Sequence, residues 1–181
     1  AEWQYPKWEI LFNKTIDLMC DKKKIEEDYS LILEVMALDN ESENILDACE
    51  NNLPEDELEL LIRNSIKHLQ TQARWQVAEL IGRKGIKKFD HYLLSMINDY
   101  DKYVQRRALI SLTKLNPKIA EDILFNRLSD SDDYIRLVSI RLLREINSHR
   151  LADAINLLKN DKFKYIIEEI NEITSSLIFS E

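Results

Sequence analysis

Glycine and proline are scarce in this chain, which has 2 Gly and 3 Pro among its 181 residues. Folds rich in β-structure use these residues in their many tight turns, so the scarcity argues against a β-sandwich or a β-barrel. No apolar run approaches the roughly 20 residues that a transmembrane helix requires, and we expect no membrane association. The abundance of Leu, Ile, Glu, Lys and Arg instead favours helices.

Residues and motifs for common chemistry are also few. Cys20 and Cys49 lack the spacing of a metal site or a disulfide framework, and we expect buried free thiols, as in a reducing cytoplasm. The chain has no Gly-rich phosphate loop and no Gly-x-Ser-x-Gly motif. His68, His91 and His149 are scattered, without a second ligand at metal spacing. We therefore expect a cytoplasmic protein with no metal, no cofactor and no catalytic activity.

Charge is distributed unevenly along the chain. The formal net charge is −8, so nonspecific attraction to nucleic acid or to an anionic membrane is not expected. Residues 1–60 hold 5 basic and 17 acidic residues, a net charge of −12, whereas residues 61–181 hold 20 and 16, a net charge of +4. An acidic first third and a mildly basic remainder indicate two different surfaces.

The sequence does contain one pattern that returns every 31 residues. In each copy, four positions are spaced by 4, 4 and 3 residues, which places them on one face of an α-helix. The four copies are Ala73, Val77, Ile81 and Lys84; Val104, Ala108, Leu112 and Leu115; Ile135, Ser139, Leu143 and Ile146; and Ile166, Ile170, Thr174 and Leu177. A second helical face precedes each copy, so the repeating unit is a helical hairpin.

The turns of this hairpin repeat as well. An Asp column (Asp99, Asp130 and Asp161) precedes the second helix, where a carboxylate can accept hydrogen bonds from free backbone N–H groups. A second column follows that helix and holds Gly85, Asn116 and Asn147. These residue types tolerate the left-handed conformation that ends many helices.

Residues 101–109 (DKYVQRRAL) and 132–140 (DDYIRLVSI) resemble the D-x-x-V-R-x-x-A pattern of HEAT-like repeats, with Gln105 where Arg is usual. The resemblance covers roughly residues 55–178 and implies an all-α, right-handed solenoid of stacked hairpins. We expect irregular acidic cap helices over residues 1–54 and four HEAT-like hairpins over 55–181, within one continuous domain. An irregular first hairpin would make five in all. Trp3 and Tyr5 either join the N-terminal cap or stay exposed as binding anchors.

In HEAT-like stacks the second helix of each hairpin lines the concave face, which implies a groove for a partner. Arg74 and Arg136 are alternatively explained by a structural ladder with neighbouring aspartates. The remaining candidates for the groove are Trp75, Glu79, Tyr103, Arg106, Arg107, Arg141 and Arg144. An acidic patch of Glu26, Glu27, Asp28, Glu41 and Glu43 is a second candidate surface.

These features predict a non-catalytic protein-binding module, monomeric alone, which acts as an adaptor or as an immunity-like inhibitor. A basic, nucleic-acid-degrading toxin would contact the acidic patch, and an acidic partner would contact the arginines. The alternative is a HEAT-like alkylpurine DNA glycosylase or DNA-binding protein, since Trp75, Glu79 and Arg106 or Arg107 loosely resemble the Trp, carboxylate and Arg of that family. The glycosylase family uses Asp as its carboxylate, whereas this chain has Glu79. Nucleic-acid binding is also unexpected for an acidic chain.

Overall fold

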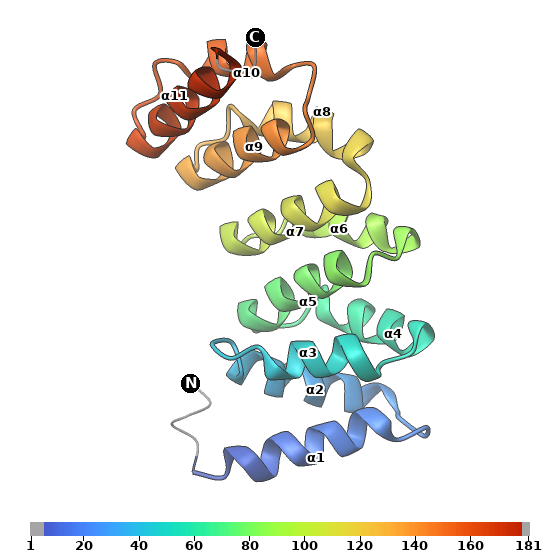
Figure 1. Ribbon diagram of the computed structural model, residues 1–181. Helices are drawn as coiled ribbons and strands as arrows, with labels where there is room; N and C mark the ends of the chain where they lie inside the picture. Colours follow the sequence, from blue (N-terminus) through green and yellow to red (C-terminus); the bar gives the residue numbers. More distant parts are fainter. Residues whose placement is uncertain (1–5, 179–181) are drawn as a thin grey trace. The chain divides into compact units, whose positions relative to one another are not determined.

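The computed structural model describes residues 6–178, with side chains described to residue 176, and all regular structure in that span is helical (Figure 1). After α1 (Trp8–Cys20), the helices pair into five hairpins, as the sequence predicted. They are α2 (Glu26–Leu38) with α3 (Asn44–Asn52), α4 (Glu55–Ser65) with α5 (Thr71–Lys84), α6 (Asp90–Met96) with α7 (Lys102–Leu115), α8 (Pro117–Arg127) with α9 (Asp133–Glu145), and α10 (Leu151–Leu158) with α11 (Lys164–Ile178). A short 3₁₀ helix, η2 (Lys87–Phe89), leads into α6. Trp3, Tyr5 and the side chain of Leu177 lie outside the described residues.

The chain forms two compact units, residues 1–111 and 112–181, and the division falls within the last turn of α7. The expected boundary between cap helices and regular hairpins lay at residue 54. In the structure, α2 packs against α4 and α5, and α3 packs against α5. The acidic helices and the first regular hairpins therefore share one core.

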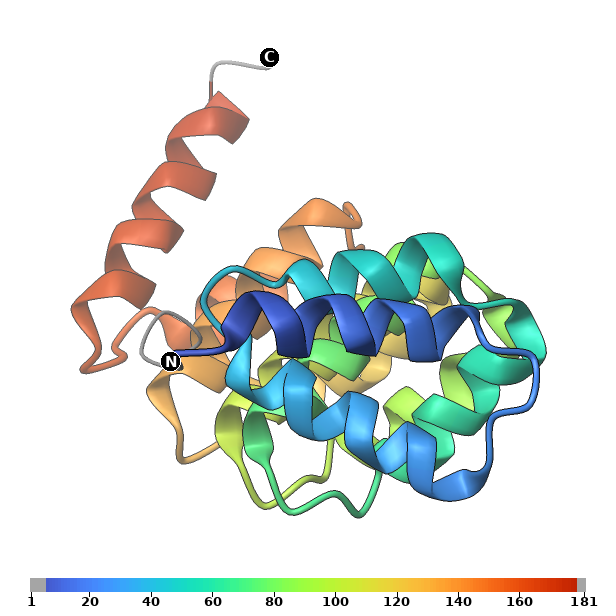
Figure 2. The ribbon, with the colours of Figure 1, turned by 90° about the horizontal axis from the view of Figure 1, so that it is seen from below.

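The core of the first unit follows the predicted columns. Ala73, Val77, Ile81, Val104 and Ala108 are all fully buried. α1 packs on α2 and α3 and lies across them at the start of the unit (Figure 2). It thereby covers apolar surface that the first hairpin would otherwise expose, which is the role of a cap in a repeat stack.

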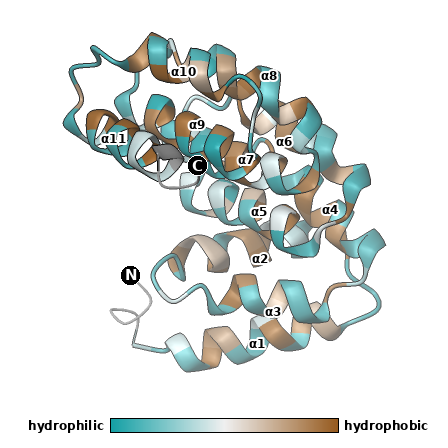
Figure 3. Cartoon of the chain, turned by 45° about the horizontal axis from the view of Figure 1, so that its top comes forward, coloured by the Kyte–Doolittle hydropathy of each residue, from teal (hydrophilic) through white to brown (hydrophobic). Residues whose placement is uncertain are grey.

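The core of the second unit uses the same columns in later copies. Leu112, Ile135, Leu143 and Ile166 have no exposed surface. Apolar and polar residues alternate around the helices with this helical period (Figure 3). The column weakens toward the end of the chain, because Thr174 in α11 is exposed rather than buried.

Only two of the three residues in the column that follows the second helices, Gly85, Asn116 and Asn147, adopt the left-handed conformation. Gly85 and Asn147 have φ of 64° and 51°, as the sequence predicted. Asn116 was expected to do the same and does not, because its φ is −147°. Its side chain instead accepts a hydrogen bond from the Ile119 amide and begins α8, so one residue both ends α7 and caps the next helix.

Two arginines, the buried Arg74 and the partly buried Arg136, connect successive repeats, as the ladder interpretation predicted. Arg74 Nε donates to Asp99 Oδ2 at 2.8 Å and Arg74 Nη2 to Asp99 Oδ1 at 3.1 Å. In the second unit Arg136 makes the same pair with Asp161 at 2.8 and 2.9 Å. The hydrogen bond from Arg136 holds the pKa of Asp161 below its usual value. In the repeat between them, Gln105 occupies the position equivalent to Arg74 and Arg136, and its side-chain amide donates to the Asp99 carbonyl.

Candidate protein-binding surface

Four predicted groove residues in the first unit lie in contact with one another. The rings of Trp75 and Tyr103 meet edge to face, with centroids 5.4 Å apart. The Arg107 guanidinium lies 5.2 Å from the Trp75 ring and 5.1 Å from the Tyr103 ring. Arg107 Nη1 also lies 3.0 Å from Glu79 Oε2. The guanidinium of the preceding residue, Arg106, also lies over the Tyr103 ring, 5.3 Å from its centroid.

Arg83 extends this cluster toward α3. Its guanidinium pairs with Glu79 Oε1 at 2.7 Å, Glu43 at 2.9 Å and Asp47 at 2.7 Å. Glu50 approaches the same guanidinium at 3.6 Å. Burial lowers and the Glu79 carboxylate raises the pKa of Arg83, and the net shift is upward, so the group stays charged.

Together these residues form one charged and aromatic surface, which we name the α3–α5–α7 face. It crosses the second helices of the first three hairpins. It consists of Asp47, Glu50, Glu79, Arg83, Trp75, Tyr103, Arg106 and Arg107. Its α3 end is acidic, because several carboxylates surround the one Arg83 side chain. Its α7 end is basic and aromatic. The face therefore carries charges of both signs in a fixed order.

The remaining two groove arginines belong to the second unit. Arg141 Nε donates to Glu169 Oε2 at 2.6 Å, and Arg144 Nη1 donates to Glu169 Oε1 at 3.1 Å. Arg144 also lies 3.9 Å from Glu172. The Glu169 side chain is only 7% exposed, while those of Arg141 and Arg144 are 55% and 40% exposed. Both arginines thus serve first to neutralise a carboxylate that α11 buries.

The predicted acidic patch does not form a single cluster. Glu26, Glu27 and Asp28 occupy the first turn of α2, where Asp28 Oδ2 accepts a hydrogen bond from the Ile25 amide at 2.8 Å. Glu41 and Glu43 follow the other end of that helix. A 13-residue helix separates its ends by roughly 20 Å. Glu43 instead belongs with the carboxylates around Arg83.

Sequence reasoning missed three residues of the α3–α5–α7 face. Arg83 is four residues after Glu79, a spacing that brings side chains together on a helix, so this pair was readable from the sequence. Asp47 and Glu50 were not readable, because they reach Arg83 across 36 and 33 residues of chain. One expected buried residue is also exposed: Cys20 faces solvent, whereas Cys49 is buried.

The face offers little support for base excision. Stacking on an extruded base requires an open aromatic ring, and Trp75 is 6% exposed beneath Arg107 and Tyr103. Glu79 is held by two arginines. Within residues 6–178 no three His, Cys, Asp or Glu side chains are grouped so as to hold a metal ion. No helix in this span combines the length and the apolar character that crossing a bilayer requires.

Part of the chain is similar to a known repeat family. Residues 91–170 match a family model described as HEAT repeats. A search of curated proteins found no match to the chain. The matched residues run from α6 to α11 and include both segments that resemble the D-x-x-V-R-x-x-A pattern. Over residues 91–170 this chain therefore carries HEAT repeats, and the family resemblance drawn from its sequence is confirmed there.

Proposed function

We propose that this chain is a non-catalytic protein-binding module and that the α3–α5–α7 face takes the partner. HEAT repeats generally mediate protein–protein interaction and are typically non-catalytic. The observation that carries the proposal is that Tyr103 (37% exposed) and Arg107 (side chain 31% exposed) are held on one face over the buried Trp75 ring. Trp, Tyr and Arg are the residues most enriched among those that dominate binding energy at protein interfaces.

The order of charges on the face defines the partner. The α3 end, with Asp47 at 59% side-chain exposure, suits a basic group. The α7 end, with Arg106 and Arg107, suits a carboxylate or an aromatic ring. Complementary charges in a fixed order steer association and set the register of the complex. The partner would therefore place a basic group against the acidic α3 end and an acidic group against the basic α7 end.

This arrangement is compatible with an adaptor and with an immunity-like inhibitor, which differ in the partner's charge. A basic, nucleic-acid-degrading toxin would depend chiefly on the acidic α3 end and its neighbour Glu43. An adaptor that holds an acidic protein or peptide would depend chiefly on Arg106 and Arg107. Arg141 and Arg144 already neutralise the buried Glu169 and would add to the second mode only through their remaining N–H groups.

Affinity capture from host lysate with charge-reversed baits tests the proposal. Asp47→Lys and Arg106→Glu each reverse one end of the face, and we expect each to reduce recovery of a protein that the wild type retains. Lys118→Glu on α8, an exposed residue outside the face, is the matched control and should leave recovery unchanged. Loss with Asp47→Lys alone would indicate a basic partner, and loss with Arg106→Glu alone an acidic one. Recovery that neither reversal changes would refute the placement.

One further assay addresses the glycosylase alternative. Release of alkylated base from duplex DNA that disappears in Glu79→Gln would replace the binding-module proposal by an enzymatic one. We expect no release from the wild type. The comparison must include circular dichroism of the variant, because Glu79 also holds Arg83 and Arg107.

A further inference from the structure

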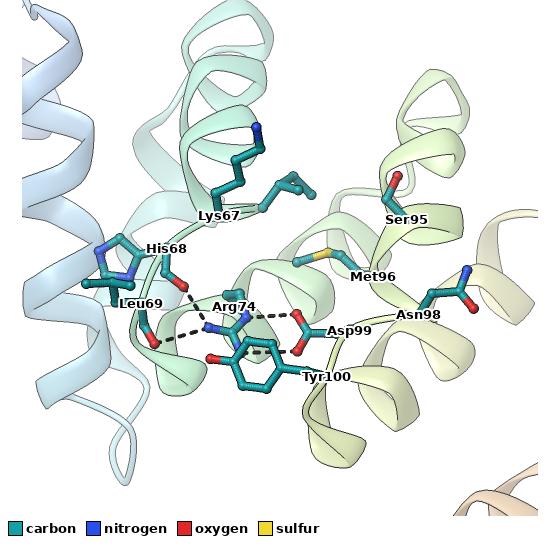
Figure 4. A pocket seen from close by; sticks show the side chains of 10 residues that line it. Lys67, His68, Leu69, Arg74, Ser95, Met96, Asn98, Asp99 and Tyr100 are labelled. Carbon is teal, nitrogen blue, oxygen red and sulfur yellow. Dashed lines mark hydrogen bonds and ion pairs between the residues drawn. The ribbon is translucent and has the colours of Figure 1, made fainter.

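A pocket of about 450 Å³ opens in the first unit and shares no lining residue with the α3–α5–α7 face. It lies between the α4–α5 turn and the α6–α7 turn (Figure 4). Ile66 and Met96 contribute apolar lining, and Lys67 stands on the opposite side from the Arg74–Asp99 pair (Figure 4). Nothing in the proposed function uses this pocket.

Arg74 cannot serve as the ligand-binding group of this pocket. Besides its two hydrogen bonds to Asp99, its Nη1 donates to the carbonyls of His68 at 2.6 Å and Leu69 at 3.2 Å. Its Nη2 also donates to Thr71 Oγ1 at 3.3 Å. The Tyr100 ring covers the guanidinium, with its centroid 4.4 Å from Cζ. With all its N–H groups engaged, the pair forms a neutral wall rather than an anion site.

Two residues at the rim of the pocket are apolar at a repeat position that is polar in the later repeats. Leu69, Tyr100, Ser131 and Lys162 occupy the same slot in four successive turns. The later two are polar, as expected for an exposed turn. The first two flank the pocket, and they are apolar although Leu69 is 87% exposed and Tyr100 is 78% exposed. Two such side chains beside an apolar hollow indicate a contact surface.

The charge of the occupant follows from the lining. His68 Nε2 lies 3.3 Å from Glu34 Oε1, and Arg74 is paired with Asp99. Among the described residues that line the pocket, Lys67 is the one charged group without an ionic partner. A ligand that reaches both the apolar hollow and Lys67 therefore gains by carrying a carboxylate next to its apolar group.

We propose that this pocket binds a segment of a partner protein in which a large apolar side chain stands beside an Asp or Glu residue. The apolar side chain enters between Leu69 and Tyr100, and the carboxylate pairs with Lys67. This site is a second docking surface on the first unit and does not depend on the α3–α5–α7 face.

Selection of a phage-displayed random heptapeptide library on the immobilised full chain tests this proposal. We expect a consensus of Leu, Phe, Tyr or Trp within two residues of Asp or Glu. The selected peptide is then synthesised with a fluorophore, and its Kd is measured by polarisation. Leu69→Ser and Tyr100→Ser, which introduce the polar type of the third repeat, should each weaken binding about tenfold, the effect of removing one buried apolar side chain. Lys67→Glu should weaken the same peptide and should not weaken a version in which Asp or Glu is replaced by Lys.

Leu157→Ser is the matched control, because Leu157 is 53% exposed on α10 in the second unit, and it should leave the Kd unchanged. Leu69→Ser removes little buried surface, so its circular dichroism spectrum should match that of the wild type. A library without a consensus, a basic or polar consensus, or a peptide insensitive to Leu69→Ser and Tyr100→Ser overturns the proposal. A concentration-dependent dimer that these substitutions abolish also overturns it, since the occupant would then be a second copy of the chain. Arg106→Glu should not affect this peptide, so failure here is distinct from failure of the α3–α5–α7 face.

Discussion

Arg74→Leu should be among the most damaging single substitutions in this chain. The Arg74 and Asp99 side chains are 2% and 8% exposed, with their charged atoms 2.8 Å apart. Removing the guanidinium leaves a buried carboxylate without its counterion and takes the donor from the His68 and Leu69 carbonyls. Breaking a buried pair by deleting one partner costs about 3–5 kcal/mol in the free energy of unfolding.

The sign of a second substitution separates this mechanism from simple loss of packing. Asp99→Asn in the wild type removes half of a favourable pair and should destabilise the protein. In the Arg74→Leu background the same change removes an uncompensated buried charge, so it should restore part of the lost stability. The two effects of Asp99→Asn therefore have opposite signs, which a double-mutant cycle measures directly.

The assay is equilibrium urea unfolding followed by circular dichroism, with the slope m checked for each variant. Arg150→Leu is the matched control, because its bridge to Asp122 is nearly as short at 2.9 Å but the carboxylate it leaves behind is on a side chain that is 82% exposed. An exposed pair contributes about 0–1 kcal/mol. Equal costs for Arg74→Leu and Arg150→Leu, or Asp99→Asn effects of the same sign in both backgrounds, would refute the reasoning.

Three further predictions rest on local geometry. Gly82→Ala should destabilise by about 1–3 kcal/mol, because a Cβ there would lie 2.5 Å from Ser111 Oγ and 2.8 Å from Ser111 Cβ; urea unfolding should show partial rescue by Ser111→Gly. A thiol reagent at neutral pH should label the exposed Cys20 but not Cys49, since burial raises the pKa of the Cys49 thiol; mass spectrometry of Cys20→Ser should show no adduct. The pKa of Asp161 is lowered in the folded state, so its ionised form stabilises the protein above the unfolded pKa of about 3.9. The stability gap between wild type and Asp161→Asn should therefore close as pH falls below that value, as urea titrations at several pH values would show.

Much of the fold could be predicted from the sequence because each repeat carries its own helical pattern. Val77, Ala108 and Ser139 share a column and are all fully buried, although only the first is strongly apolar. The 31-residue register identified them, not their hydrophobicity. The same register identified Arg74 and Arg136 as ladder residues, since an aspartate column lies 25 residues after each.

The candidate site was less predictable, because its partners come from irregular parts of the chain. α3 does not follow the repeat register, so nothing in the sequence places Asp47 and Glu50 beside Arg83. The exposed residues Arg106 and Arg107 could be identified as polar positions of α7. That Arg107 would cover Trp75 and pair with Glu79 required the distances between helices. Periodicity reports which side of a helix is buried and leaves unspecified which charges meet across helices.

Site-specific photo-crosslinking in the native host tests the central claim, that the α3–α5–α7 face binds a protein, most directly. Benzoylphenylalanine is placed at Asp47 or at Arg106, the two ends of the face, and at His91, an exposed position on α6. We predict that Asp47 and Arg106 form an adduct with the same protein, identified by mass spectrometry, and that His91 forms none with it. Adducts from His91 alone, equal adducts from all three positions, or no adduct from either end of the face would contradict the account.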